Sequence, residues 1–526
     1  MRKKLLTTGI TWVSFLSLYG GGIVTNTNQN VTFLRNPARE AATEIDAAYT
    51  NPAGLAFLEK DGFFLSLNNQ SAFQTRTITT DFAPFKGLGG SAVKEFEGKA
   101  KALVIPNLQA AFKTGKWVIS ANIGVEGGGG TLDFSKGLPS FESQVAMLPV
   151  TLQQNGIPVT QYSLDSRLKG SSVIYGVQLG VTYKMNDYLS AYLGGRASIV
   201  NNGYDGYIRN IQASMADGME VGKYLTTVVI PQLNGAGNSL QPIIAGGYGD
   251  AQLSMLVGAG VLTQAQVAQL AAGLGISPDE AGKMTVNATQ SAFFQKATMV
   301  QGVASQVAAK TVNQEINIKQ NGFGIAPIIG FNYHWNSLNI GVKYEFNTSL
   351  KLTNKNGGTN TTGLEEYNDG YKTPYDIPAL FAAGVSYDII PEATLSVGYH
   401  HFFESDAKML KDKQQYINGG TNEYLAGVEY RINKTFLVSY GIQFTRFSAK
   451  DDFQRDMSFA INSYSFGLGG AINLTDNIRI NLAYFLSSFY DLNKISKNYV
   501  AEAPVPGMDT FSRTSKAFGI GLDFKF

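Results

Sequence analysis

The histidines are the residues of this sequence that could carry acid–base chemistry. His400 and His401 are adjacent and precede Glu404 and Asp406, and a carboxylate beside an imidazole can activate water for hydrolysis. Adjacent residues of a strand face opposite ways, so these two histidines cannot serve one site. The third, His334, adjoins a tryptophan at a predicted turn, where an interfacial aromatic cluster is the simpler interpretation.

Other chemistry-bearing motifs are missing from the sequence. The 526 residues include no cysteine, which excludes disulfides, thiolate metal sites and cysteine nucleophiles. There is no Gly-x-Ser-x-Gly, His-Glu-x-x-His or Walker motif. We therefore predict that the protein is not an enzyme and has no catalytic residue, metal or cofactor. The competing hypothesis, a hydrolase, requires that activity be lost when His400 or His401 is changed to alanine.

The composition favours an extended all-β protein. Only 16% of the residues are charged, against about 25% in ordinary soluble domains, and the chain holds 58 glycines and 12% aromatic residues. The mean hydropathy of −0.05 argues against a bundle of membrane helices. A net charge of +2 gives no broad attraction to nucleic acid. A soluble chain of this length would divide into domains, and a large closed barrel avoids that division.

Apolar and polar residues alternate with a period of two over much of the chain. Phe436, Val438, Tyr440, Ile442 and Phe444 share one face of a predicted strand, opposite mainly small and polar residues. The same pattern recurs in residues 338–347, 477–487 and 517–526. An apolar face that ends in Tyr or Phe, opposite a face rich in Gly, Ser and Asn, is typical of a transmembrane barrel with its apolar side toward lipid.

The lengths of the connections support the barrel. Every second connection is tight, as at Gly115, Asn186-Asp187 and Asp476-Asn477, and the others are longer. Short periplasmic turns that alternate with longer external loops produce this order. The sequence thus predicts an all-β fold, a transmembrane antiparallel β-barrel of about fourteen strands within residues 61–526. The predicted strands are 62–78, 103–113, 116–126, 171–184, 188–201, 315–334, 337–352, 378–388, 392–403, 421–433, 435–447, 461–474, 477–490 and 514–526.

Residues 1–22 have the features of a secretory signal peptide. Arg2, Lys3 and Lys4 precede the apolar stretch Leu5–Leu18, which is too short to span a bilayer. No Ala-x-Ala site follows, so we place the cleavage in the small-residue run Gly20–Gly22. Export, combined with the barrel pattern, predicts that the protein resides in the bacterial outer membrane.

The insertion between the fifth and sixth strands, residues 204–313, differs in kind. Thr263 begins a capping box and Ser277 precedes a proline, which are typical starts of helices. We predict short helices and a longer one near 288–310. Their apolar residues either pack together within a long external helical loop or form a groove that captures apolar ligands, and both can hold. These candidate capture residues are Leu253, Leu256, Val257, Val261, Val267, Leu270, Phe293 and Phe294.

Residues 23–60 lack strand alternation and are predicted to form an N-terminal plug, or hatch. Two pairs, Asn36-Pro37 and Asn51-Pro52, each fit an N-cap followed by proline at the first helical position. Short helices ahead of a barrel indicate material folded inside the lumen. A barrel of this size would pass water and solutes through an empty lumen, so a plug would make it a gated pore.

Four short motifs follow one another along the chain. Asn51-Pro52-Ala53-Gly54-Leu55 precedes the first strand, and Gly322-Phe323-Gly324, Leu338–Tyr344 and Tyr375–Leu380 come later. In this order they resemble the FadL-type outer-membrane transporters of long-chain fatty acids and hydrocarbons, whose hatch motif the first one matches. The resemblance implies fourteen strands, a hatch, external helices that capture ligand, an inner apolar site and a break in an early strand for sideways exit. Gly127–Gly130, at the end of the third predicted strand, is either that break or the start of a flexible loop.

We therefore predict passive uptake of a hydrophobic small molecule, such as a long-chain fatty acid, by capture at external loops and hatch-gated diffusion. Its partners would be that ligand and outer-membrane lipid, without nucleic acid, and we expect a monomer. Four cations that strand parity turns inward are candidate partners of a ligand carboxylate: Arg196, Lys343, Arg431 and Arg479. The alternatives are a general porin and a structural or adhesive barrel. The ligand's identity and its exit, sideways or into the periplasm, stay open.

Overall fold

A computed structural model describes residues 22–154, 156–358, 367–500 and 504–526. The predicted signal peptide, residues 1–22, lies outside these ranges except for its last residue. Within them, no helix combines the length and the apolar character needed to cross a membrane.

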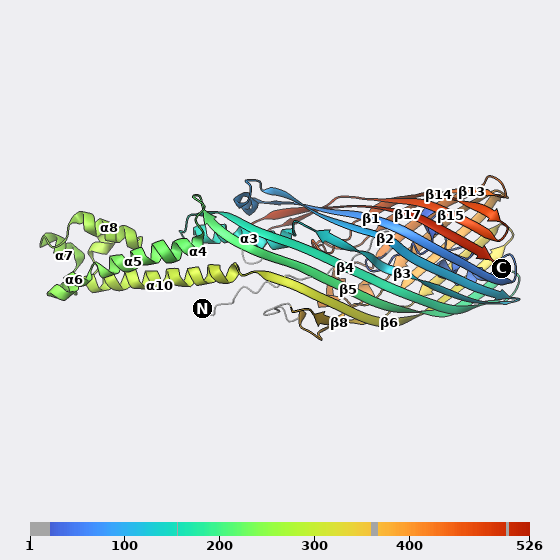
Figure 1. Ribbon diagram of the computed structural model, residues 1–526, viewed down its shortest axis with the longest axis horizontal. Coiled ribbons are helices and arrows are strands. Elements are labelled where there is room, and N and C mark those ends of the chain that lie inside the picture. The colour runs from blue at the N-terminus through green and yellow to red at the C-terminus, as the bar shows by residue number, and fades with distance from the viewer. Residues whose placement is uncertain (1–21, 155, 359–366, 501–503) are drawn as a thin grey trace.

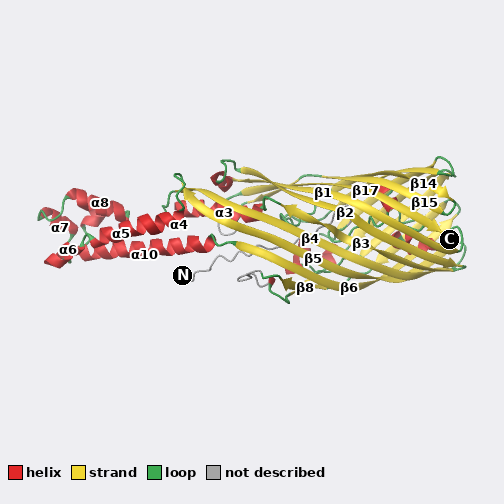
Figure 2. Cartoon of the chain, in the orientation of Figure 1, coloured by secondary structure: helices red, strands yellow, loops and turns green. Residues whose placement is uncertain are grey.

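The described residues form one closed antiparallel barrel (Figures 1 and 2). Each barrel strand pairs with the next, and the last pairs with the first, which confirms the predicted fourteen-stranded barrel. The fourteen strands are β1 (Gly62–Phe82), β2 (Val93–Thr114), β3 (Trp117–Phe134), β4 (Val159–Lys184), β5 (Leu189–Met215), β6 (Gln314–Trp335), β7 (Leu338–Glu345), β10 (Leu380–Ile390), β11 (Ala393–Phe402), β12 (Thr421–Arg431), β13 (Phe436–Arg446), β14 (Ser463–Thr475), β15 (Ile478–Phe489) and β17 (Gly507–Lys525). Three short strands extend the sheet on its external side: β8 (Lys351–Asn356), β9 (Lys372–Pro374) and β16 (Leu492–Ser496).

Two predicted boundaries are wrong because β3 and β5 continue beyond their predicted ends on the external side of the barrel. Residues 204–215 belong to β5, so the helical insertion begins only after Met215. Gly127–Gly130 lie inside β3, which continues to Phe134, and not at its end. Long paired neighbours hold these extensions, since β4 and β5 remain in register for most of their length.

The alternation places apolar side chains on the outside of the barrel. On β13, Val438, Tyr440 and Ile442 are exposed, whereas Ser439 and Gln443 are buried toward the lumen. Exposed aromatic residues gather at the ends of the strands that meet in short turns: Trp117, Tyr183, Tyr188, Tyr333, Trp335, Tyr387, Tyr430 and Phe436. An apolar belt that ends in an aromatic girdle fits the hydrocarbon layer and its boundary.

The segment that precedes β1 lies inside the barrel. It contains the helices α1 (Val31–Arg35) and α2 (Ala47–Thr50) and the 3-10 helix η1 (Pro52–Phe57), all of them largely buried. Asn36 ends α1 instead of starting a helix, so the predicted cap at Asn36-Pro37 is wrong. Asn51 does precede η1, with Pro52 at its first position.

Glycines of the barrel wall make room for this segment, which we call the plug (residues 30–58). A Cβ atom on Gly341 would lie 2.0 Å from the backbone oxygen of Glu40, and one on Gly398 would lie 1.9 Å from the Glu40 carboxylate. A Cβ atom on Gly427 would lie 1.9 Å from the side-chain oxygen of Asn36. Many glycines on the inner face are therefore required by the plug.

The insertion forms a stalk that extends beyond the external ends of β5 and β6 (Figure 1). Thr263 makes the predicted capping box, and Ser277 is the predicted N-cap before Pro278 and makes a capping box as well. The stalk helices are α4 (Val221–Tyr224), α5 (Ile230–Asn238), α6 (Gln241–Ile243), α7 (Leu253–Gly258), α8 (Gln264–Leu274), α9 (Pro278–Gly282) and α10 (Val286–Lys310), with π-helical turns η3 (Leu225–Val229) and η4 (Ile244–Tyr248). Other helices lie in the external loops: η2 (Ala83–Gly87), α3 (Pro139–Gln154), η6 (Glu404–Asp406) and η7 (Leu410–Tyr416).

The change Gly341→Ala should displace the plug without preventing barrel formation. Its methyl group would meet a backbone oxygen that cannot rotate away, and overpacking of this kind costs about 1–3 kcal/mol. We expect a higher single-channel conductance in planar bilayers. The control is Gly195→Ala, whose added Cβ would meet one atom at 3.2 Å. Equal conductance of wild type and Gly341→Ala would contradict the expected displacement.

Candidate functional site

The motif Asn51–Leu55 fastens the base of the plug to the barrel wall. The side-chain amide of Asn51 donates to the backbone oxygen of Phe331 on β6, with 3.1 Å between the two atoms. The hydroxyl of Thr182 on β4 donates to the backbone oxygen of Pro52 at 2.8 Å. Backbone oxygens of the motif thus serve as acceptors for polar side chains that point into the lumen.

The rest of the motif continues this contact. The hydroxyl of Ser190 on β5 donates to the backbone oxygen of Ala53 at 2.7 Å. A Cβ on Gly54 would lie 2.1 Å from the backbone oxygen of Ala42, so only glycine fits there. Leu55 is fully buried within the plug. The structure places all five motif residues at contacts within the plug or between plug and wall.

Two of the four predicted carboxylate partners form one buried network. Arg196 pairs with Glu345 at 2.7 Å and with Glu126 at 3.1 Å, and Lys343 pairs with Glu345 at 2.6 Å. The cations of Arg196 and Lys343 also lie 4.9 and 4.6 Å from the ring centroid of Tyr49 in the plug. These charges already have buried partners, and they hold the plug against β3, β5 and β7.

A second network contains another predicted partner. Arg479 on β15 pairs with Glu44 of the plug at 2.7 Å. Nearby, Arg35 and Arg39 of the plug both pair with Glu429 on β12. Because each cation has a carboxylate within bonding distance, this network is a second attachment of the plug to the wall.

The fourth predicted partner, Arg431, is exposed at the end of β12. Its guanidinium donates to the backbone oxygen of Pro391 at the neighbouring turn, at 3.3 Å. Strand parity thus predicted the inward direction of three of the four cations correctly. It could not show that carboxylates pair with them.

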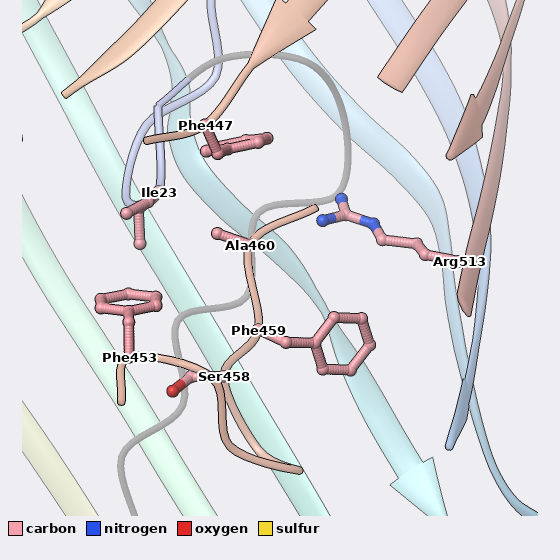
Figure 3. A pocket seen from close by; sticks show the side chains of 7 residues that line it. All are labelled: Ile23, Phe447, Phe453, Ser458, Phe459, Ala460 and Arg513. Atoms are coloured by element: carbon pink, nitrogen blue, oxygen red, sulfur yellow. The ribbon is translucent and has the colours of Figure 1, made fainter. Parts of the chain in front are cut away.

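A narrow cavity of about 10 Å³, with room for about one water molecule, lies on the external side of the plug (Figure 3). Most of its wall comes from the loop between β13 and β14, with one residue each from β17 and from the chain before the plug. The lining residues are Ile23, Phe447, Phe453, Ser458, Phe459, Ala460 and Arg513. Figure 3 shows the rings of Phe447, Phe453 and Phe459 around the space into which Arg513 extends.

Cations stand beside this aromatic cavity. Lys413 in η7 lies 4.2 Å from the ring centroid of Phe453 and donates to the hydroxyl of Ser458. Arg513 is 95% buried and stacks over Phe489, 4.5 Å from its ring centroid. Burial, together with the positive charges of Arg455 and Lys494, lowers the pKa of Lys413 to about 7. Sequence analysis missed these residues because they lie in irregular loops, where no period shows the direction of a side chain.

The barrel wall has a break in hydrogen bonding between β2 and β3. The two strands pair at Asn107 with Gly124 and again at Lys101 with Thr131, and pairing stops between these points. Gly128 has a φ of 66°, and a Cβ there would lie 2.0 Å from the backbone oxygen of Ser172 on β4. Glycine is therefore required for the kink in β3 that accompanies the break.

Residues 22–29, which we call the strap, lie along the unpaired stretch of β3. The backbone N–H of Asn26 donates to the backbone oxygen of Glu126 at 2.7 Å, and the side-chain amide of Gln29 donates to that of Val125 at 2.8 Å. A Cβ on Gly127 would meet the backbone oxygen of Val24 at 2.5 Å. The strap thus joins the cavity, which Ile23 lines, to the break.

No protein-family model and no curated protein sequence matches the chain. Among solved structures, a FadL homologue of Pseudomonas aeruginosa aligns with a TM-score of 0.56 at 11% identity, over 98% of this chain and 100% of the other. The deltaS2S3 mutant of the monoaromatic hydrocarbon channel TodX aligns with a TM-score of 0.50 at 13% identity, over 94% and 99%. The chain has the FadL-type fold.

In this FadL-type barrel the stalk residues proposed for capture mostly pack against one another. Leu253, Leu256 and Val267 belong to one apolar core at the tip of the stalk, with Val257 and Leu270 packed against it. Phe293 belongs to a second core with Leu233 and Ala297, whereas Val261 and Phe294 are exposed. The structure therefore favours mutual packing for six of the eight residues, and the cavity lining contains none of them.

Two of the three histidines of the FadL-type barrel contact the plug, and the other faces away from it. His400 lies between two carboxylates, with Nε2 2.7 Å from Glu40 of the plug and Nδ1 2.9 Å from Glu423 on β12. His401 faces the other way, as parity predicts, and contacts the side-chain oxygen of Asn422 at 3.0 Å. The third histidine packs its ring against that of Phe57 in η1. The two adjacent histidines therefore do not form one site.

The change Glu345→Gln should lower the stability of the barrel strongly. It would leave two buried cations, Arg196 and Lys343, without their shared carboxylate, and breaking a buried ion pair costs about 3–5 kcal/mol. The measurement is the temperature at which the folded form is lost on gels that separate folded from unfolded barrel. Glu59→Gln, which removes an exposed partner of Lys525, should leave that temperature almost unchanged. Equal temperatures for the two variants would argue against a stabilising role for the network.

Proposed function

We propose that the protein carries hydrophobic small molecules across the bacterial outer membrane and that long-chain fatty acids are its ligands. The apolar outer belt supports the location, since it matches the hydrocarbon layer of a bilayer. The buried plug argues against a general porin, because it fills the lumen that a porin keeps open. The FadL homologue and the TodX hydrocarbon channel share the fold, which supports an apolar cargo without defining it.

The observation that carries the proposal is the aromatic cavity beside buried cations. Phe447, Phe453 and Phe459 offer apolar contacts, and Arg513 supplies positive charge. Lys413, whose pKa burial lowers to about 7, would be held in its charged form by a bound carboxylate. Within the described part of the chain, no carboxylate forms an ion pair with Lys413. A monoaromatic hydrocarbon would gain only a cation–π contact from these charges, about 0.5–2 kcal/mol. The carboxylate of a fatty acid would form charge-assisted hydrogen bonds with them, which are stronger. This difference favours a fatty acid over a monoaromatic hydrocarbon.

The driving force in this mechanism is affinity alone. Burial of each methylene of an acyl chain contributes about 0.8 kcal/mol, so a long chain leaves water readily. The sequence contains no Walker motif that would supply energy from ATP. Transport would then follow the concentration gradient that consumption inside the cell maintains.

The strap supplies a route from the cavity to the bilayer. The cavity, at about 10 Å³, is far smaller than the range of about 300–1,000 Å³ that is typical of ligand sites. An acyl chain would therefore need to displace Ile23, and the strap would carry that movement to Asn26 at the break in the wall. Exit through the break keeps the acyl chain in apolar surroundings, which favours the sideways route over release into the periplasm.

Loss of the cations beside the cavity should weaken fatty-acid binding selectively. Hydrogen bonds to charged groups are worth about 1.5–3 kcal/mol, so Lys413→Met and Arg513→Gln should each raise the dissociation constant for oleate about tenfold or more. Binding of oleyl alcohol, which has no carboxylate, should change little. The measurement is titration of the purified barrel, with Lys86→Met in an exposed loop as the control. Equal losses for oleate and oleyl alcohol would contradict the assignment of a carboxylate site.

The change Gly128→Val should block transport while sparing binding. Valine cannot keep the left-handed backbone or the close approach to Ser172, so the kink in β3 and the break beside it should be lost. We expect labelled oleate uptake, in a strain without other fatty-acid transporters, to fall at least tenfold. The control is Gly203→Ala, whose Cβ would meet only a rotatable serine hydroxyl. Normal uptake by a folded Gly128→Val barrel would exclude the sideways route.

A further inference from the structure

Glu404 is a buried carboxylate whose partners are neutral. It begins η6, directly after β11, and it is fully buried. One carboxylate oxygen accepts the backbone N–H of Ile23, and the other accepts the hydroxyl of Thr421 at 2.5 Å. No lysine, arginine or histidine in the described ranges forms an ion pair with Glu404. A charge buried in this way is unfavourable unless a cation compensates it.

The charged groups around Glu404 do not provide that cation. Burial raises the pKa of Glu404 to about 7, and the carboxylate of Glu423 acts in the same direction. His400 is the nearby base, and its two ring nitrogens contact Glu40 and Glu423. The site therefore lacks one positive charge at the position where the nitrogen of Ile23 lies.

That nitrogen follows directly after the expected cleavage region. Gly20 and Gly22 offer small residues three positions and one position before a cut that would release Ile23. Gly22 is also confined, since a Cβ there would come within 2.8 Å of the Phe402 ring and 2.9 Å of the Glu404 carboxylate. The chain before Ile23 thus approaches Glu404 closely enough that a side chain at position 22 would collide with it.

We propose that signal peptidase cuts between Gly22 and Ile23 and that Glu404 binds the α-ammonium group created by the cut. In the uncut chain, the same nitrogen is a neutral amide that donates one hydrogen bond. Hydrolysis of the Gly22–Ile23 peptide bond by water leaves a carboxylate on Gly22 and an ammonium on Ile23, so the donor at Glu404 gains a positive charge. Hydrogen bonds between two charged groups are shorter and stronger than those between neutral groups.

This ion pair would fix the upper end of the strap after export. The side chain of Ile23 lines the cavity, and Asn26, three residues on, contacts the unpaired stretch of β3. A fixed amino group at Glu404 sets the position of both contacts. Removal of the signal peptide would thereby fix the strap in its final position inside the lumen. This inference does not depend on which molecule the barrel carries.

The experiment measures the terminus and its reactivity on the mature protein purified from outer membranes. N-terminal sequencing should begin at Ile23. Acetic anhydride at pH 7 acetylates free α-amino groups, whose ordinary pKa is about 7.7–8.0, and mass spectrometry of the N-terminal peptide gives the rate. We expect acetylation of Ile23 to be at least tenfold slower in the folded protein than in the same protein unfolded in urea.

The variant Glu404→Gln separates pairing from simple burial. It keeps the shape and hydrogen-bonding capacity of the side chain but removes the charge, so acetylation of folded Glu404→Gln should be at least tenfold faster than that of the wild type. Glu59→Gln, at an exposed carboxylate, should leave the rate unchanged. A first residue other than Ile23, equal rates in folded and unfolded wild type, or full protection in Glu404→Gln would each overturn the proposal. If Glu404→Gln does not fold, the pH dependence of acetylation in the folded wild type tests pairing. An ammonium paired with a carboxylate keeps its proton above its ordinary pKa of about 7.7–8.0, and a rate that rises at lower pH would indicate burial without pairing and overturn the proposal.

Discussion

A strand that crosses a bilayer must satisfy its backbone hydrogen bonds within the protein, because lipid offers no partners. The closed ring of fourteen strands meets most of this constraint, with single bulges in several strand pairs and a longer interruption between β2 and β3. There the strap replaces part of the missing hydrogen bonding between β2 and β3, since Asn26 and Gln29 donate to the backbone oxygens of Glu126 and Val125. The strap thus provides donors for backbone oxygens that the break would otherwise leave unpaired.

The need to pair buried polar groups also explains how the plug is attached to the barrel wall. A lumen filled by protein is a place of low dielectric, so each charge in it needs a partner. Arg196 with Glu345, and Arg479 with Glu44, provide such partners between wall and plug or within the wall around it. These buried pairs set where the plug sits more than they add to the net stability of the barrel, since desolvation offsets much of their attraction. Cations that are to meet a ligand must lie elsewhere, as Lys413 does.

The sequence predicted those features that follow from a local period. Alternation along β13 and the tight turns gave the barrel, the outward face and the inward direction of Arg196, Lys343 and Arg479. It did not predict α3, which carries Pro149 inside it, or the loop that forms the cavity. It also misjudged Asn36, because an Asn-Pro pair fits the end of one helix as well as the start of another. Pairings such as Arg35 with Glu429 join residues almost four hundred positions apart, and no local pattern encodes them.

The cavity and the break are separated by only three residues along the chain, from Ile23 to Asn26, and the chain bends at Ile23 and Val24. A residue spans at most about 3.3–3.6 Å, so the two contacts lie within about 11 Å of each other along the chain. A ligand that moved the backbone of Ile23 would either shift Asn26 or break the hydrogen bond between the nitrogen of Ile23 and Glu404, whereas a change of the Ile23 rotamer would leave both contacts in place. The strength of that upper attachment decides which of these occurs. A firm attachment would make the strap bend toward the lumen at its lower end, which uncovers the break while the plug stays in its place.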